Sequence, residues 1–362
     1  MADHWSNCIT HFDEDVGTFI AEYFAQTDRI AFVFGGAGFD PRATHVSRTL
    51  AGVMGNRLHG LFVREERGDN NPVLVNAAEA NERNLSATVP NSDVVRVDIF
   101  EDDKAPVGGV RVSERLRQLQ LPEGVTDVIL DMSALSNSIS FPAAQILLSR
   151  VKQLSGVSFH ILVASDPDLD DRIVGEPSER AQAIRGYQRK LAGIKNAATI
   201  WLPHLAPGRD RVLEKVRSSL GDIHKICPVL PFPATNPRRA DDLLAEYYQQ
   251  VFQEWGVDGR DLLYVSERNP LDSYRSISTL RTRHFKTVAD YYEPELVLTP
   301  IGSKVMAAGA MMAAIRHNIA VQYVEALRFE VVGGAPAVQT AKGPQRLAHV
   351  WLEGPIYDGY YA

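Results

Sequence analysis

Short apolar runs rich in β-branched residues alternate with helix-length segments along most of the chain. The expected strands are 29–34, 57–64, 93–99, 126–131, 158–164, 197–202, 225–230, 261–266, 295–299 and 319–325. The expected helices are 12–26, 42–54, 72–85, 111–120, 141–154, 178–192, 240–255, 274–292 and 303–316. Nearly continuous apolar strands separated by helices are typical of a parallel sheet that is covered on both faces. The sequence therefore predicts a doubly wound α/β fold with mainly parallel sheets.

The number of expected strands is large for one open sheet. Those up to about residue 165 complete a Rossmann-sized set, and a polar, proline-containing stretch, SDPDLDDRIVGEPSERAQ, follows at 165–182. We therefore predict two Rossmann-like domains, residues 1–170 with a leading helix and residues 171–362 with a C-terminal tail. A polar excursion within one domain, with a single sheet, is the alternative.

Composition narrows the class of protein. The chain has 362 residues, a formal net charge of −7 and a pI near 5.8, so binding of nucleic acid over its whole surface is not expected, although a local basic patch stays open. Its two cysteines, Cys8 and Cys227, form no CxxC pattern, which indicates neither a disulfide framework nor a metal site. With no signal-peptide pattern and no apolar run near about 18 residues, we expect a soluble cytoplasmic protein without a membrane span.

The loops that follow the strands are the places to look for function, because ligands bind outside the carboxyl ends of open parallel sheets. The first such loop reads GGAGFDPR, at 35–42. Gly35, Gly36 and Gly38 allow a tight turn and a close approach to a ligand, and the following helix start with Arg42 would favour an anion. Asp40 could bind a hydroxyl group. The alternative is a plain turn in which Asp40 caps the helix.

A second loop, VILDMSALSNSISFP at 128–142, is rich in hydroxyl groups. Asp131 ends an expected strand and could accept hydrogen bonds from ribose hydroxyls, while Ser133 could donate to a phosphate or a base edge. A loop that only caps the helix beginning near Phe141 has the same composition. Both interpretations stay open from the sequence.

Two further loops, 229–242 and 264–276, each place an Asn-Pro pair and arginines before a helix. Arginine binds phosphate and carboxylate groups through two parallel hydrogen bonds. The candidate ligand-binding residues here are Asn236, Arg238, Arg239, Arg268 and Arg275. A solvated start of a helix is the alternative for any one of them.

The last loop joins an expected strand, 295–299, to a helix of small residues through Gly302, Ser303 and Lys304. This pattern resembles the C-terminal motif of CARF-type Rossmann domains, which sense cyclic oligonucleotides in prokaryotic immune systems. The doubled glycine typical of that family is absent. The resemblance implies a nucleotide-sensing, Rossmann-like protein in which these three residues bind the ligand.

Together these loops predict a protein that binds a nucleotide-like, phosphate-bearing ligand, as a sensor or regulatory component of a prokaryotic defence or signalling system. One alternative is a nucleotide-processing enzyme in which Asp40 or Asp131 acts as general acid or base, or binds Mg²⁺. The other is a non-catalytic scaffold that contacts nucleic acid or protein through the basic segment 273–292. A protein partner or a homo-oligomer is compatible with each alternative.

Overall fold

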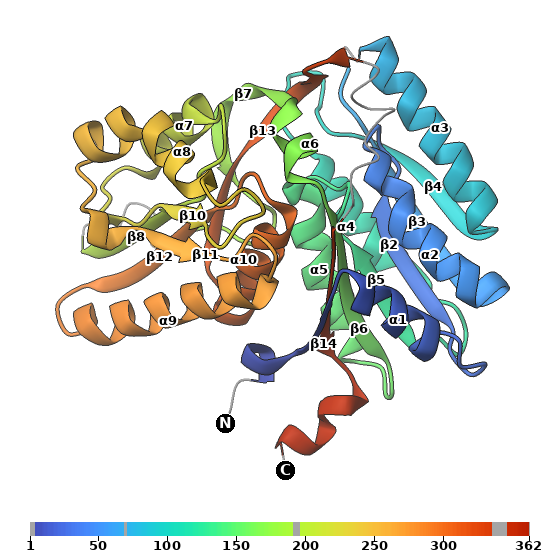
Figure 1. Cartoon of the computed structure of the whole chain (residues 1–362). Helices are drawn as coiled ribbons and strands as arrows, with labels where there is room; N and C mark the ends of the chain where they lie inside the picture. Colours follow the sequence, from blue (N-terminus) through green and yellow to red (C-terminus); the bar gives the residue numbers. More distant parts are fainter. Residues whose placement is uncertain (1–3, 69–70, 191–195, 335–345, 362) are drawn as a thin grey trace. The chain divides into compact units, whose positions relative to one another are not determined.

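The computed structural model describes residues 4–68, 71–190, 196–334 and 346–361 (Figure 1). The chain divides into two compact units, Met1–Gly175 with Arg328–Ala362, and Glu176–Leu327. It leaves the first unit within strand β7 (Ile173–Ala183) and returns within strand β13 (Ala320–Val331). The predicted second domain, 171–362, differs from the observed unit because residues from 328 onward belong to the first unit.

The first unit contains a seven-stranded sheet in the order β1-β14-β6-β5-β2-β3-β4. The strands are β1 (Ile9–Phe12), β2 (Ala31–Gly36), β3 (Leu58–Glu66), β4 (Asn91–Asp98), β5 (Asp127–Asp131), β6 (Ser158–Ser165) and β14 (Arg346–Glu353). Neighbouring strands from β4 to β6 pair in parallel, whereas β14 is antiparallel to both β6 and β1. Counted along the chain, the five parallel strands have the Rossmann order 3-2-1-4-5. The predicted α/β class is confirmed.

Helices cover this sheet on both faces. The helices of this unit are α1 (Glu14–Tyr23), α2 (His45–Met54), α3 (Pro72–Thr88), α4 (Gly108–Gln118), α5 (Asn137–Val151) and α6 (Pro167–Arg172), and its short helices are η1 (His4–Asn7), η2 (Pro41–Thr44), η3 (Gly55–Arg57) and η6 (Pro355–Tyr361). Ile20 of α1 and Leu50 of α2 pack with Ile129 of β5 in one core cluster. Val128 and Leu130 point to the opposite face of β5 and are also fully buried, as expected for a central parallel strand.

The second unit contains a five-stranded sheet in the order β7-β13-β12-β8-β9 and a two-stranded sheet, β10-β11. Its other strands are β8 (Ala197–Pro203), β9 (Lys225–Ile226), β10 (Val229–Pro231), β11 (Leu263–Val265) and β12 (Glu293–Thr299). Its helices are α7 (Asp210–Leu220), α8 (Arg239–Glu246), α9 (Pro270–Val288) and α10 (Lys304–His317), with a π-helical turn η4 (Gln249–Glu254) and a short helix η5 (Gly259–Asp261). The pairs β8·β9, β8·β12, β12·β13 and β10·β11 are parallel.

Several segments differ from the sequence prediction; the predicted strand 225–230, for example, is divided into β9 and β10, which belong to different sheets. The predicted helix 178–192 is wrong, because β7 occupies 173–183, and residues 191–192 lie outside the described residues. β7 is an edge strand in which every residue except Ser178 is exposed or half-buried, so its sequence lacks an apolar run. Strands β1 and β14 were not predicted, although they pair with each other from opposite ends of the chain.

Candidate functional site

Strands β2 and β5 are neighbours at the point where the strand order of the first unit reverses. Ligands of open α/β sheets bind at such a switch point, outside the carboxyl ends of the strands. The loops that begin there are 35–42 and 131–137, two of the loops that the sequence singled out. The fold thus brings the predicted residues of the first unit to one edge of the sheet.

The glycines after β2 allow these two loops to pack closely. A Cβ atom added at Gly35 would lie 3.3 Å from Cβ of Asp131, and one added at Gly36 would lie 2.8 Å from the carbonyl oxygen of Ala134. Gly38 has open space around it, and its carbonyl accepts a hydrogen bond of 2.8 Å from Asn81 of α3. Gly36 is therefore required by the packing of the two loops, a Cβ atom at Gly35 would make a tight contact with Asp131, and Gly38 is not constrained by packing.

Arg42 is buried between two carboxylates. Its backbone N–H and its guanidinium both donate to Asp40, with Nη2 2.6 Å from Oδ2, and Nη2 lies 2.8 Å from Oδ1 of Asp170 in α6. Although burial opposes its charge, Asp170 and Asp40 raise the pKa of Arg42 well above its ordinary value. With only 1% of its surface exposed, Arg42 ties the loop after β2 to α6. Asp40 also caps η2, as the alternative from the sequence proposed.

Asp131 is the titratable group at the centre of the switch point. It is 1% exposed, and its Oδ1 accepts hydrogen bonds from the backbone N–H (3.0 Å) and the hydroxyl (2.5 Å) of Ser133. Burial raises the pKa of Asp131 to about 7, with Asp40 adding to the shift, against the hydrogen bonds from Ser133 and the charge of Arg42. A carboxyl group with this pKa can donate or accept a proton near neutrality. The Ser133 hydroxyl also accepts from the N–H of Ala164, at 2.7 Å, which fixes its position.

Sequence reasoning missed the contribution of β3 to this edge. Glu65, near the end of β3, accepts a hydrogen bond of 2.8 Å from the backbone N–H of Ser136 and pairs with Arg67 at 2.5 Å. Glu65 thereby fixes the loop that precedes α5. Charged residues at the end of the apolar run 57–64 were the available signal.

In the second unit, the parallel pair β10·β11 brings the predicted arginine loops together. Glu267, 2% exposed, accepts a hydrogen bond of 3.0 Å from the N–H of Thr235 and lies 3.2 Å from Nε of Arg239. Asn236 caps its own turn by accepting from the N–H of Arg238 at 3.0 Å.

The charge of Arg239 is thus balanced by a buried carboxylate, whereas Arg238 and Arg268 are exposed. The side chain of Arg238 lies 3.7 Å from Asp242, and Arg275 is exposed on α9.

The Gly-Ser-Lys turn follows β12, beside the loop that follows β8. Gly302 has a φ of +82°, and a Cβ atom there would lie 2.8 Å from Cβ of Ala206. Ser303 caps α10 by accepting from the N–H of Met306 at 3.4 Å, and the helix begins at Lys304. Ser303 therefore has the capping role that its position before a helix suggests.

His204, directly after β8, is a further residue that the sequence did not single out. It is fully buried, and neither ring nitrogen has a hydrogen-bond partner among the described residues. Burial lowers the pKa of His204 to about 3, so the ring is neutral at physiological pH. A histidine directly after an apolar strand, in WLPHL, was the available signal.

The chain matches no protein-family model, and a search of curated proteins found no similar sequence. Within the described part of the chain, no helix is both long and apolar enough to cross a lipid bilayer. The same residues contain no cluster of three or more His, Cys, Asp or Glu side chains that could hold a metal ion. Neither comparison therefore assigns the chain to a family.

Proposed function

We propose that the first unit binds a nucleotide-like, phosphate-bearing ligand over the switch point between β2 and β5. The supporting observation is the Rossmann strand order with Asp131 and the glycine loop at the point where that order reverses. Asp131 would bind a ribose hydroxyl or a base edge. Phosphate contacts would come from the start of α5, where the hydroxyls of Ser136 and Ser138 lie 3.0 Å apart. Arg42 would hold the loop in place.

A sensor role in a prokaryotic defence or signalling system is the biological setting that we favour. It depends on the resemblance of Gly302, Ser303 and Lys304 to the CARF-type motif. An enzyme remains the alternative, since a carboxyl group with a pKa of about 7 at Asp131 suits general acid–base catalysis, with Mg²⁺ bridging the phosphates. A sensor returns its nucleotide intact, whereas an enzyme converts it.

Thermal denaturation with a panel of mono-, di- and cyclic nucleotides, with and without Mg²⁺, tests the binding proposal. A ligand at about 100 times its Kd stabilises the folded state by about 2.7 kcal/mol, which is measurable as a rise in Tm. We expect Asp131→Asn to reduce this rise and Asp93→Asn, a matched change on exposed β4, to leave it unchanged. The proposal fails if no nucleotide raises Tm, or if both variants respond equally.

A specific observation supports a second function, contact of α9 with a nucleic-acid backbone. Arg275, Arg283 and Lys286 are exposed on this helix, and the sequence has no Asp or Glu from 273 to 289. At about 1.5 Å per residue, Arg275 and Lys286 lie about 16 Å apart along the helix, which is further than one nucleotide reaches. These three cations would therefore contact several phosphates of a polymer.

Charge reversal tests this second function. We expect Arg283→Glu with Lys286→Glu to weaken binding of single-stranded or duplex nucleic acid and to reduce its salt slope by about 2. The control is Arg115→Glu with Arg117→Glu on α4, which changes the net charge equally at exposed positions. Equal loss in both variants would indicate a general charge effect. Binding to anionic lipid vesicles alone would also exclude a nucleic-acid partner.

A further inference from the structure

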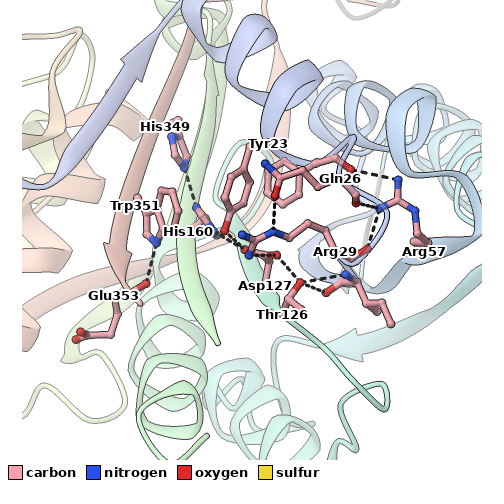
Figure 2. Close-up of polar contacts among 12 residues, drawn as sticks. Tyr23, Gln26, Arg29, Arg57, Thr126, Asp127, His160, His349, Trp351 and Glu353 are labelled. Atoms are coloured by element: carbon pink, nitrogen blue, oxygen red, sulfur yellow. Dashed lines mark hydrogen bonds and ion pairs between the residues drawn. The ribbon is translucent and has the colours of Figure 1, made fainter. Parts of the chain in front are cut away.

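A row of hydrogen bonds crosses four adjacent strands of the first unit, away from the proposed ligand site. Asp127 of β5 accepts from Nε2 of His160 in β6 at 3.0 Å. Nδ1 of His160 lies 3.0 Å from Nε2 of His349 in β14, and Nδ1 of His349 lies 3.0 Å from Nδ1 of His11 in β1. Figure 2 shows Asp127, His160 and His349 in line. We call these four residues the histidine row.

The strand register places the row on one face of the sheet. His11 lies opposite His349. On β6, His349 pairs with Leu162 and Asp127 pairs with Ser158, and each of these partners is two residues from His160. Side chains two residues apart point to the same face. Phe19 of α1 covers this face, with ring centroids 4.4 Å from His349 and 4.5 Å from His11.

Burial decreases along the row toward β1. Asp127, His160 and His349 are fully buried, whereas His11 is only partly buried. Protons can therefore enter from solvent at His11, the outermost member of the row.

The hydrogen bonds determine how many protons the row can hold. If the carboxylate of Asp127 accepts from His160, then His160 accepts from His349, which accepts from His11, and all three rings are neutral. A proton that binds Nε2 of His11 can shift each of the other protons one step inward. The row then ends in an imidazolium at His160 beside the carboxylate of Asp127, and every hydrogen bond is kept. One added proton is thus accommodated.

A second added proton is not accommodated. It would place hydrogen atoms on both of two facing nitrogens that lie 3.0 Å apart, so one hydrogen bond would be lost and two cations would be adjacent. Burial lowers the pKa of His349 well below its ordinary value, and it lowers that of His11 despite the charge of Asp15. The row therefore resists repeated protonation while it stays folded.

The remaining polar groups around the row stabilise its carboxylate end. Tyr23 of α1 donates to Oδ1 of Asp127 at 2.9 Å, and Thr126 donates to Oδ2 at 2.6 Å. Arg29 lies 3.7 Å from Oδ2 and stacks over the ring of Tyr23 (Figure 2). Burial alone would raise the pKa of Asp127, but the hydrogen bond and charge of His160 lower it. Asp127 therefore stays ionised and can balance one positive charge.

We propose that the histidine row is an acid-sensitive latch that holds β1 and β14 on the sheet of the first unit. β1 and β14 come from opposite ends of the chain, and the row joins each of them to its neighbour across the sheet. At neutral pH the row is closed. In acid, the histidines bind more protons when these strands are undocked than when they are docked, so protonation favours undocking.

Hydrogen exchange of backbone amides at pH 7.5 to 5.0, corrected for intrinsic rates, tests this latch. Each proton bound in excess by the undocked state raises its population up to about tenfold per pH unit below about pH 6.5. We expect β14 amides to lose protection by between about ten- and a hundredfold per pH unit. Amides of the central strand β2 should stay protected.

Two matched variants complete the test. His11→Phe keeps a ring against Phe19 and removes one titrating group, so it should lower the pH slope of β14 by up to about tenfold per pH unit. His11→Gln serves the same purpose if the first variant does not fold. His59→Phe on β3, outside the row, should leave the slope unchanged. The latch is refuted if β14 shows no pH dependence, if β2 and β14 lose protection together, or if His59→Phe acts like His11→Phe.

Discussion

Alanine at Gly36 and alanine at Gly38 should have opposite effects, although the two positions are two residues apart in one loop. At Gly36 the new methyl group would lie 2.8 Å from the carbonyl oxygen of Ala134 and 3.0 Å from its carbonyl carbon. Both are backbone atoms of the loop after β5, so rotation of a side chain cannot relieve the contact. Overpacking of this kind costs about 1–3 kcal/mol. Gly38 has no atom within 4 Å of an added Cβ, and its φ is not positive.

For a unit of this size, about 1 kcal/mol corresponds to about 2–4 °C in Tm. We therefore expect Gly36→Ala to lower Tm by about 2–12 °C in a thermal melt followed by circular dichroism. Gly38→Ala should leave Tm unchanged or raise it slightly, because alanine reduces the entropy of the unfolded chain. Equal Tm values for Gly36→Ala and the wild type would refute the packing of the two loops. Equal losses in both variants would show that the loop requires glycine for another reason.

Three further predictions concern charge and packing. The pKa of Asp131 is raised in the folded state, so its ionisation lowers the stability of the fold as pH rises from about 4 to 7. At pH 8, Asp131→Asn should therefore unfold at a higher urea concentration than the wild type. This difference in stability should vanish below about pH 4. Arg42→Met removes the cation shared by the buried Asp40 and the partly buried Asp170, and it should lower the free energy of unfolding by about 3–5 kcal/mol in urea titrations. Gly309→Ala would place a methyl group 2.1 Å from the carbonyl oxygen of Pro270, so α9 and α10 must separate and the Tm of the second unit should fall by several degrees. Gly52→Ala, on α2 of the first unit and with open space around it, should leave the Tm of the second unit unchanged.

The sequence predicted the elements whose burial is uniform. β2, β5 and β6 are buried at every residue, so each appears as an apolar run that local reasoning recognises. β7 is stabilised by pairing at a sheet edge, and its polar sequence gives no such run. β1 has only four residues, and its partner β14 lies more than 300 positions later, which no local pattern can reveal.

The same distinction applies to the candidate site. Gly35 and Asp131 could be placed together because the carboxyl ends of parallel strands share one edge of a sheet. The burial of Arg42 between two carboxylates could not be predicted, since the second of them, Asp170, lies on a helix far along the chain. Burial determines the protonation state of Asp131 and His204, and burial follows from tertiary packing rather than from residues that are neighbours in sequence.

Mass spectrometry of small molecules released by denaturing the purified protein tests the central proposal most directly. The wild type and Asp93→Asn should release the same nucleotide-like compound in similar amounts, and Asp131→Asn should release much less. Release of no phosphate-bearing compound from the wild type, together with no nucleotide that raises its Tm, would contradict a ligand site at the β2/β5 switch point. Equal release from all three proteins would place the ligand elsewhere in the chain.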